Sequence, residues 1–286
     1  MSAFLILFLN GLTNGMLLFL IAAGLTTIFG VMGILNFAHA SLYMLGAYLS
    51  FSCVVQGKLN FWLALAIAPL IVALVGGILE ILFLRRIYKQ DVSFQLLLTF
   101  AFILIINDSI RLLWGSAPLT TPIPQLLQTN IVILDRTYPI YNLFIIIVAF
   151  FVGIGLWLFL SRTRWGKILR AAAQDRTMVG ALGINVNLLF TIVFMLSAWL
   201  GGIAGVLAAP LRTLSLELAD QIIMESFIVA IIGGLGSLPG SLLAALTIGQ
   251  INAFGVIFAP TAQVAFPYIL MAVTLLFRPQ GLLHRE

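Results

Sequence analysis

Residues 140–160 read IYNLFIIIVAFFVGIGLWLFL. This stretch contains no charged residue in 21 positions, and about 20 mostly apolar residues are enough for a helix to cross the hydrocarbon core of a membrane. The rest of the chain has the same character, because 62% of its 286 residues are hydrophobic and 8% are charged. In a soluble domain roughly a quarter of the residues are charged. The stretch and the overall composition therefore predict an integral membrane protein.

Eight or nine such stretches are predicted, joined by short connectors. They occupy residues 4–29, 61–84, 94–114, 140–160, 188–210, 222–232, 240–258 and 262–277. A further segment of small residues follows the first of these and ends at residue 55. Interruptions by glycine and proline predict one or two broken or re-entrant segments. Because these spans leave no room for a soluble domain, we predict an all-α, polytopic transmembrane helical bundle that forms a single domain over residues 1–286.

The basic residues are distributed as membrane orientation requires. Ten of the 14 Lys and Arg residues fall in the segments 85–93 and 161–187 and in the tail after 277. Short loops that are rich in Lys and Arg stay on the cytoplasmic side. We therefore expect these segments and the carboxyl terminus to be cytoplasmic. The net charge of +5 follows from this topology, and no clustered basic face indicates nucleic-acid binding.

One connector is strongly charged. It holds six of the 23 charged residues of the chain, namely Arg162, Arg164, Lys167, Arg170, Asp175 and Arg176. Between residues 165 and 182 the apolar residues recur at helical spacing, which predicts one amphipathic surface helix. Gly183 then suits the left-handed conformation that ends helices. Such a helix either lies among lipid headgroups or contacts another protein, and helix physics alone does not decide between them.

Several short motifs occur in order along the chain. They are GLTNG at 11–15, GILNFAH at 33–39, LYMLGAY at 42–48, RAA at 170–172 with GIN at 183–185, GGLGSLPG at 233–240 and RPQG at 278–281. With these motifs at these separations, the sequence resembles the permease subunits of branched-chain amino-acid ABC importers. More specifically, it resembles the H-type permease of the leucine-isoleucine-valine system. The resemblance covers nearly the whole chain, and Ala40 stands where the family often has glycine.

The resemblance implies a role for the charged connector. In ABC importers a cytoplasmic helix of the permease docks into a groove on the ATPase, so residues 162–185 are expected to be this coupling helix. The implied coupling residues are Trp165, Arg170, Ala172, Asp175 and Gly183. The implied partners are a second, homologous permease subunit, two ATP-binding subunits, a periplasmic substrate-binding protein and membrane lipid, with no nucleic acid. The implied location is the bacterial inner membrane.

The chain carries no motif for chemistry of its own. The phosphate-binding pattern G-x-x-x-x-G-K-[ST] is absent, because Ile168 follows Gly166 and Lys167 and the upstream glycine is missing. The sequence has two histidines, so no cluster with metal-ligand spacing is expected. We therefore predict no catalytic residue, no metal and no cofactor. The chain would move solute while separate subunits hydrolyse ATP.

Polar residues and helix breaks mark candidates for the translocation path. Transporter sites lie where two segments interrupted by glycine or proline meet, and residues 33–42 match residues 233–242 at several positions. The candidates are Asn36, His39, Asn107, Gly233, Gly236 and Pro239. The alternative is that the glycines let helices pack closely and that the polar side chains only bond neighbouring helices.

Other functions stay open at this stage. Close relatives of this permease type carry urea or short amides, so the resemblance indicates the type of transporter but does not fix the solute. A secondary transporter driven by an ion gradient would need carboxylates inside the membrane. The predicted spans supply three, Glu80, Asp108 and Glu225, and each of them needs a partner or water. A membrane scaffold without transport activity fits the hydrophobicity but gives no reason for the broken segments.

Overall fold

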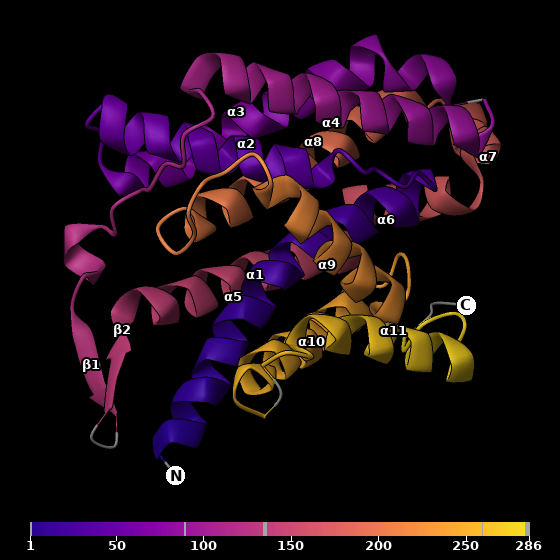
Figure 1. Ribbon diagram of the computed structural model, residues 1–286. Helices are drawn as coiled ribbons and strands as arrows, with labels where there is room; N and C mark the ends of the chain where they lie inside the picture. Colours follow the sequence, from indigo (N-terminus) through magenta and orange to yellow (C-terminus); the bar gives the residue numbers. More distant parts are fainter. Residues whose placement is uncertain (1, 89, 134–135, 259, 284–286) are drawn as a thin grey trace.

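The computed structural model describes residues 2–88, 90–133, 136–258 and 260–283, and it is predominantly helical (Figure 1). Its elements are α1 (Ser2–Met32), α2 (His39–Phe51), η1 (Ser52–Gln56), α3 (Phe61–Leu82), η2 (Leu84–Ile87), α4 (Val92–Trp114), η3 (Gln125–Leu127), β1 (Asn130–Ile133), β2 (Arg136–Pro139), α5 (Ile140–Arg162), α6 (Arg164–Gln174), α7 (Arg176–Ala181), α8 (Val186–Ala208), α9 (Leu218–Gly233), α10 (Leu238–Phe258), η4 (Gln263–Ala265) and α11 (Phe266–Phe277). The segments labelled η are short 3₁₀ or π-helical turns.

In the described part of the chain, six helices are long and apolar enough to cross a membrane. They are Phe4–Met32, Phe61–Ile87, Val92–Trp114, Ile140–Arg162, Val186–Ala208 and Leu238–Phe258. α2, α9 and α11 are also apolar but shorter. A polytopic helical bundle is therefore present, while helix length alone does not establish the predicted eight or nine spans.

α1 and α8 form the centre of the bundle. α1 packs against α5, α8, α9 and α10, and α8 packs against α2 and α3. The helices approach closely because small residues face one another: a Cβ atom placed on Gly249 would lie 2.5 Å from the backbone nitrogen of Gly15. Such contacts between small residues are how helices associate in lipid.

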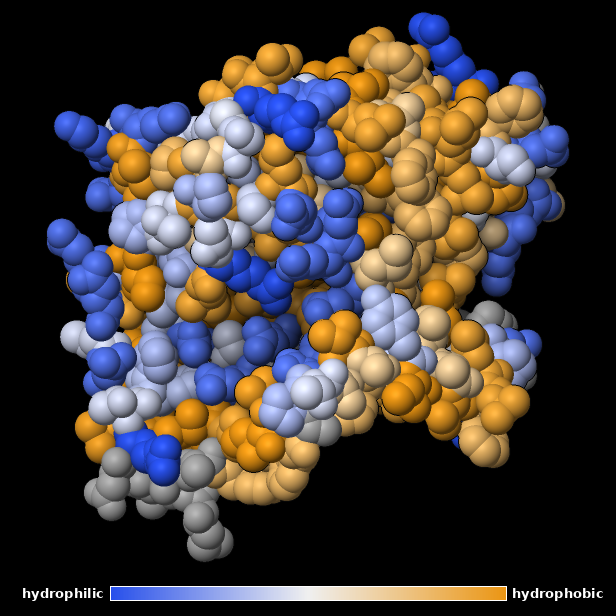
Figure 2. Space-filling model, in the orientation of Figure 1, coloured by the Kyte–Doolittle hydropathy of each residue, from blue (hydrophilic) through white to orange (hydrophobic). Residues whose placement is uncertain are grey.

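The outer helices expose large apolar side chains. On α4, Leu97, Leu104 and Leu112 are 70%, 63% and 86% exposed, and α5 exposes Phe150 and Phe151. Figure 2 shows broad apolar areas on one face of the molecule, interrupted by hydrophilic side chains. A soluble protein seldom exposes apolar patches of this extent, whereas lipid tails solvate them.

The long helices run between two ends of the molecule. Figure 1 shows the β1–β2 hairpin and the start of α1 at one end, and α7 and the end of α11 at the other. We call these the hairpin end and the α7 end. The hairpin is joined to α1 by a hydrogen bond of 2.9 Å between the hydroxyl groups of Tyr138 and Thr13. The all-α prediction missed this antiparallel hairpin, which pairs Asn130 with Pro139 and Ile133 with Arg136.

The first helix break lies directly after α1. Gly33 has a φ of +68°, a conformation that glycine adopts without strain, and residues 33–36 lie outside any helix. Nε2 of His39, at the start of α2, then donates to the carbonyl oxygen of Ile21 over 3.0 Å. Ile21 lies about 16 Å before Met32 along α1, at 1.5 Å per residue. The broken segment thus runs back beside α1 into the bundle.

The charged connector folds as two helices, so the prediction of one continuous helix is wrong. α6 ends at Gln174 and α7 begins at Arg176, with Asp175 between them at a φ of −146°. The carboxylate of Asp175 accepts hydrogen bonds from the backbone N–H groups of Thr177 and Met178 over 2.8 and 3.0 Å. Aspartate is among the preferred residues at this capping position, which explains the break. The predicted stop is confirmed, because Gly183 follows α7 with a φ of +81°.

Candidate functional site

Two arginines tie the α6–α7 segment to the bundle. Arg170 of α6 donates a hydrogen bond to the carbonyl oxygen of Leu160, near the end of α5. Arg176, at the start of α7, donates to the carbonyl oxygen of Met32, the last residue of α1. The last four carbonyl groups of a helix have no partner within it and carry partial negative charge. The α6–α7 segment therefore caps the ends of two long helices with positive charge.

The predicted coupling residues divide into internal and exposed ones. Ala172 is fully buried, together with Leu169 and Val179 of the apolar stripe. Trp165 is 49% exposed, and Met178 and Leu182 are 61% and 72% exposed. Arg170 and Asp175 are used within the chain, as an anchor and as a helix cap. The segment thus combines buried anchors with apolar side chains that are free to contact another surface.

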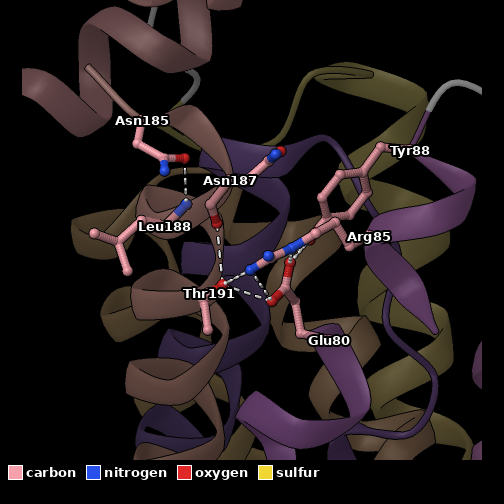
Figure 3. Close-up of polar contacts among 7 residues, drawn as sticks. All are labelled: Glu80, Arg85, Tyr88, Asn185, Asn187, Leu188 and Thr191. Atoms are coloured by element: carbon pink, nitrogen blue, oxygen red, sulfur yellow. Dashed lines mark hydrogen bonds and ion pairs between the residues drawn. The ribbon is translucent and has the colours of Figure 1, made fainter. Parts of the chain in front are cut away.

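A cluster of polar side chains lies beside this segment (Figure 3). The fully buried carboxylate of Glu80 on α3 pairs with the guanidinium of Arg85 at 3.3 Å. It also accepts hydrogen bonds from the hydroxyl of Thr191 on α8, over 2.6 Å, and from the hydroxyl of Tyr88. The sequence required a partner for Glu80, and these three groups supply it. They join α3 to α8.

Aromatic contacts connect that cluster to α7. The guanidinium carbon of Arg176 lies 4.9 Å from the ring centre of Phe190 on α8, within the range of a cation–π contact. The ring of Phe190 packs edge-on against Tyr88 with centroids 5.3 Å apart. Burial, and then the hydrogen bond to Glu80, raise the pKa of Tyr88 above its ordinary value, which favours the protonated hydroxyl that donates to Glu80. Arg176 thus contacts α1 directly and α3 through Phe190 and Tyr88.

The candidates at the first break are enclosed within the bundle. Asn36 and His39 are fully buried, and the side-chain oxygen of Asn36 accepts a hydrogen bond from the N–H of Ala38 over 3.1 Å. His39 lies between the Ile21 carbonyl and Ser197, whose hydroxyl is 3.4 Å from Nδ1. Asn107 is on α4, on the other side of α2 from the central helices. Only the contacts of His39 link helices, because Nδ2 of Asn36 and Oδ1 of Asn107 are buried and have no hydrogen-bond partner among the described residues.

Gly233, Gly236 and Pro239 lie at the turn between α9 and α10. A Cβ atom on Gly233 would come within 2.5 Å of the backbone of Ser241, and one on Gly236 within 3.2 Å of Gly30. Gly236 lines a cavity of about 670 Å³ with Lys167 and Arg170 of α6. The turn between α9 and α10 therefore lies beside α6, whereas His39 contacts α1 and α8 inside the bundle.

A polar cavity that the path prediction missed lies at the hairpin end. Its volume is about 370 Å³, and its lining includes the side chains of Asn10, Thr13, Asn14, Asn142 and Asn252. The side-chain oxygen of Asn142 is buried and has no hydrogen-bond partner among the described residues. Asn10 and Asn14 are spaced four apart on one helix face, a signal present in the sequence. Asn142 and Asn252 reach the cavity only through the packing of α5 and α10 against α1.

The arrangement is that of a transport protein. In the described part of the chain no three His, Cys, Asp or Glu side chains gather as metal ligands do, and the polar groups above hold helices together or line cavities. Apolar helices, a broken segment inside the bundle and a charged segment that caps helix ends define a polytopic α-helical membrane protein of the transporter class.

Comparison with known proteins narrows this class. Residues 7–277 match the family described as the branched-chain amino acid transport system / permease component. The chain belongs to this family, and it is a membrane-spanning permease subunit of an importer. Permease subunits of this family are not themselves enzymes.

Individual relatives cover nearly the whole chain. It is 30% identical to the high-affinity branched-chain amino acid transport system permease protein BraD of Pseudomonas aeruginosa, over 96% of this chain and 94% of that protein. It is 28% identical to the permease protein LivH of Escherichia coli K12 over the same shares. The structure of PsaBC from Streptococcus pneumoniae in complex with Fab is similar in fold, with a TM-score of 0.51 and 13% identity over 94% of this chain and 89% of that one.

Proposed function

We propose that this chain is the permease subunit of an ATP-driven importer that moves branched-chain or related small amino acids into the cytoplasm. The observation that carries the proposal is the attachment of the α6–α7 segment to the ends of α1 and α5 through Arg176 and Arg170. A force on this segment is transmitted to two of the helices that make up the bundle. The solute class is proposed from the names of BraD and LivH.

An ATP-driven importer of this type requires further subunits. A second, homologous permease would complete the membrane part, two ATP-binding subunits would drive it and a periplasmic binding protein would deliver the solute. Trp165, Met178 and Leu182 are exposed, and we assign them to the contact with an ATP-binding subunit. The loop at 115–139, with the β1–β2 hairpin, is the corresponding candidate surface for the binding protein at the other end of the molecule.

The orientation follows from the positive charges. The α7 end carries the basic α6–α7 segment and Arg85 and Arg86 of η2, so it is proposed to be cytoplasmic, and the hairpin end to face outward. Alternation of the helices between the two sides then gives nine spans: α1, α2 with η1, α3, α4, α5, α8, α9, α10 and α11. An odd number places the start of α1 outside and the tail after α11 inside a bacterial inner membrane.

The polar cavity at the hairpin end is proposed as the outer mouth of the solute path. Its lining combines amide and hydroxyl groups with the apolar side chains of Leu7, Leu211 and Val256, and includes no charged residue among those described. Uncharged amides offer hydrogen bonds to both the ammonium and the carboxylate of an amino acid. They hold it weakly enough to leave again, which a permease needs.

The test is coupled transport by the reconstituted complex. The chain, produced with the homologous permease and ATP-binding subunits, should take up leucine, isoleucine or valine in preference to urea or short amides. In Arg170→Ala, ATP hydrolysis should persist while uptake per ATP falls about tenfold, equivalent to about 1.4 kcal/mol in a rate barrier. Arg111→Ala, an exposed arginine of α4 outside the α6–α7 segment and the loop at 115–139, is the matched control and should leave the ratio unchanged.

Two results would contradict the proposal. One is solute flux through vesicles that contain this chain alone, because an ion-driven transporter or channel needs no ATPase. The other is uptake per ATP that is unchanged in Arg170→Ala while ATPase subunits remain bound.

A further inference from the structure

A second cavity at the α7 end, of about 500 Å³, is surrounded by positive charge. Its lining includes Arg85 and Arg86 of η2, Arg176 of α7, and Tyr88, Asn187 and Phe190. We call it the arginine cavity. Three elements far apart in the sequence meet there: the turn between α3 and α4, the second helix of the α6–α7 segment and the first turn of α8.

The charges around the arginine cavity are not balanced by any of the described residues that line it. Its described lining includes no Asp or Glu. Glu80, which pairs with Arg85 from behind, is fully buried and already accepts from Arg85, Tyr88 and Thr191. Arg86 is exposed, and the ion pair formed in the described part of the chain joins Arg85, not Arg86, to Glu80. After Glu80 is set against Arg85, two guanidinium groups remain without a counter-charge.

The chemistry of the lining suits a phosphate group. Guanidinium groups bind phosphate through two parallel hydrogen bonds, and arginine is the residue of choice for this contact. The first turn of α8 lines the same cavity with Val186 and Asn187, and the start of a helix carries partial positive charge. A volume of about 500 Å³ is in the range of sites for small ligands.

The surface around the arginine cavity favours a lipid as the source of that phosphate. Leu82 and Phe83, just before Arg85 and Arg86, are 46% and 45% exposed, and Val92 and Phe94, at the start of α4, are 56% and 55% exposed. In a membrane these side chains contact acyl chains at the level where headgroups begin. Basic pockets at the cytoplasmic ends of transmembrane helices bind anionic headgroups.

We propose that the arginine cavity binds the phosphate group of an anionic phospholipid, with the acyl chains lying over the apolar surface next to it. Bound there, the phosphate bridges Arg176 of α7 and Arg86 of η2 and so fastens the α6–α7 segment to the α3–α4 turn. This binding depends on the chain being embedded in a membrane but not on the solute or on ATP.

The test measures lipid retained by the permease complex after purification in mild detergent. Native mass spectrometry with phosphatidylglycerol and with phosphatidylcholine should show preferential retention of phosphatidylglycerol. Arg86→Gln should reduce that retention about tenfold, equivalent to about 1.4 kcal/mol of binding. Arg86 is exposed, so the variant should fold. Arg164→Gln, an exposed arginine of α6 that does not line the cavity, removes the same charge and should retain the lipid.

Further measurements identify the molecule that occupies the arginine cavity. Inorganic phosphate at millimolar concentration should raise the melting temperature of the permease complex less than phosphatidylglycerol does, because inorganic phosphate lacks acyl chains. An equal rise without lipid would overturn the assignment to a phospholipid. Equal retention in Arg86→Gln and the unmodified chain would also overturn it. So would loss of an ATP-binding subunit, instead of lipid, from Arg86→Gln. Uptake measured in vesicles of phosphatidylcholine alone reports on the proposed transport function independently of this site.

Discussion

Glu80 and Arg85 show how one buried carboxylate is accommodated at the edge of the membrane. Glu80 is fully buried, whereas the side chain of Arg85 is 31% exposed. Removing either residue therefore has a different consequence. Without Glu80, the guanidinium of Arg85 can turn toward water. Without Arg85, the carboxylate stays enclosed between Tyr88 and Thr191, with no positive charge against it.

We expect Arg85→Ala to be more destabilising than Glu80→Gln. Removing Arg85 leaves the buried carboxylate of Glu80 without its positive partner, and the loss of one partner of a buried ion pair costs about 3–5 kcal/mol. Glu80→Gln keeps an acceptor for Tyr88 and Thr191, so the expected cost is about 1–3 kcal/mol. Unfolding of the purified chain in detergent, followed by circular dichroism, gives both values. Arg111→Ala, an exposed residue of α4, is the control and should change stability by less than about 0.5 kcal/mol. Equal losses in the first two variants would contradict this assignment.

The α6–α7 segment shows what a pair of short helices adds beyond one continuous helix. The bend at Asp175 turns Arg176 toward the end of α1, while Arg170 of α6 reaches α5. If the segment couples the bundle to an ATPase as proposed, we expect the capping of α7 by Asp175 to matter for that coupling as much as a direct contact with a partner.

Replacing Asp175 separates its two possible roles, as helix cap and as docking charge. Asp175→Asn keeps the cap, because asparagine caps helices as well as aspartate does, whereas Asp175→Ala loses about 1 kcal/mol of helix stability. We expect Asp175→Ala to speed amide hydrogen exchange over residues 177–181 and to lower uptake per ATP, and Asp175→Asn to do neither. If Asp175→Asn also uncouples the complex while exchange is unchanged, the carboxylate acts on the ATPase and not as a cap.

The sequence predicted those elements whose signal is local. The apolar runs at 94–114 and 140–160 correspond to α4 (Val92–Trp114) and α5 (Ile140–Arg162) within two residues. The break at Asp175 was missed because the apolar stripe continues on both sides of it. The hairpin was missed because the prolines at 118, 122, 124 and 139 indicate only that helices break and that extended turns are favoured, and not which residues pair. The cavity at the hairpin end depends on residues from α1, α5 and α10, and no local pattern brings these together.

At the scale of the whole molecule, the two ends differ in charge and in structure. The α7 end carries the arginine cavity and the capped ends of α1 and α5, while the hairpin end carries an uncharged amide-lined cavity. This asymmetry fits the proposed transporter, which takes up solute at the hairpin end and is driven by a partner subunit at the α7 end. Its direction across the membrane is the property on which the other assignments depend.

Thiol labelling in intact cells tests that direction. Cys53 is the only cysteine of the chain, so Cys53→Ser gives a background on which single cysteines are introduced by Phe4→Cys, Gln128→Cys and Arg164→Cys, all at exposed positions. Nine spans with the α7 end inside predict that a membrane-impermeant maleimide labels positions 4 and 128 from outside. Position 164 should be labelled only after the cells are permeabilised, which also serves as the control for reactivity. Labelling of position 164 in intact cells would place the α6–α7 segment outside, out of reach of a cytoplasmic ATPase. Protection of position 4 with labelling of position 128 would instead leave an odd number of spans between these two positions and show that α2 with η1 does not cross the membrane.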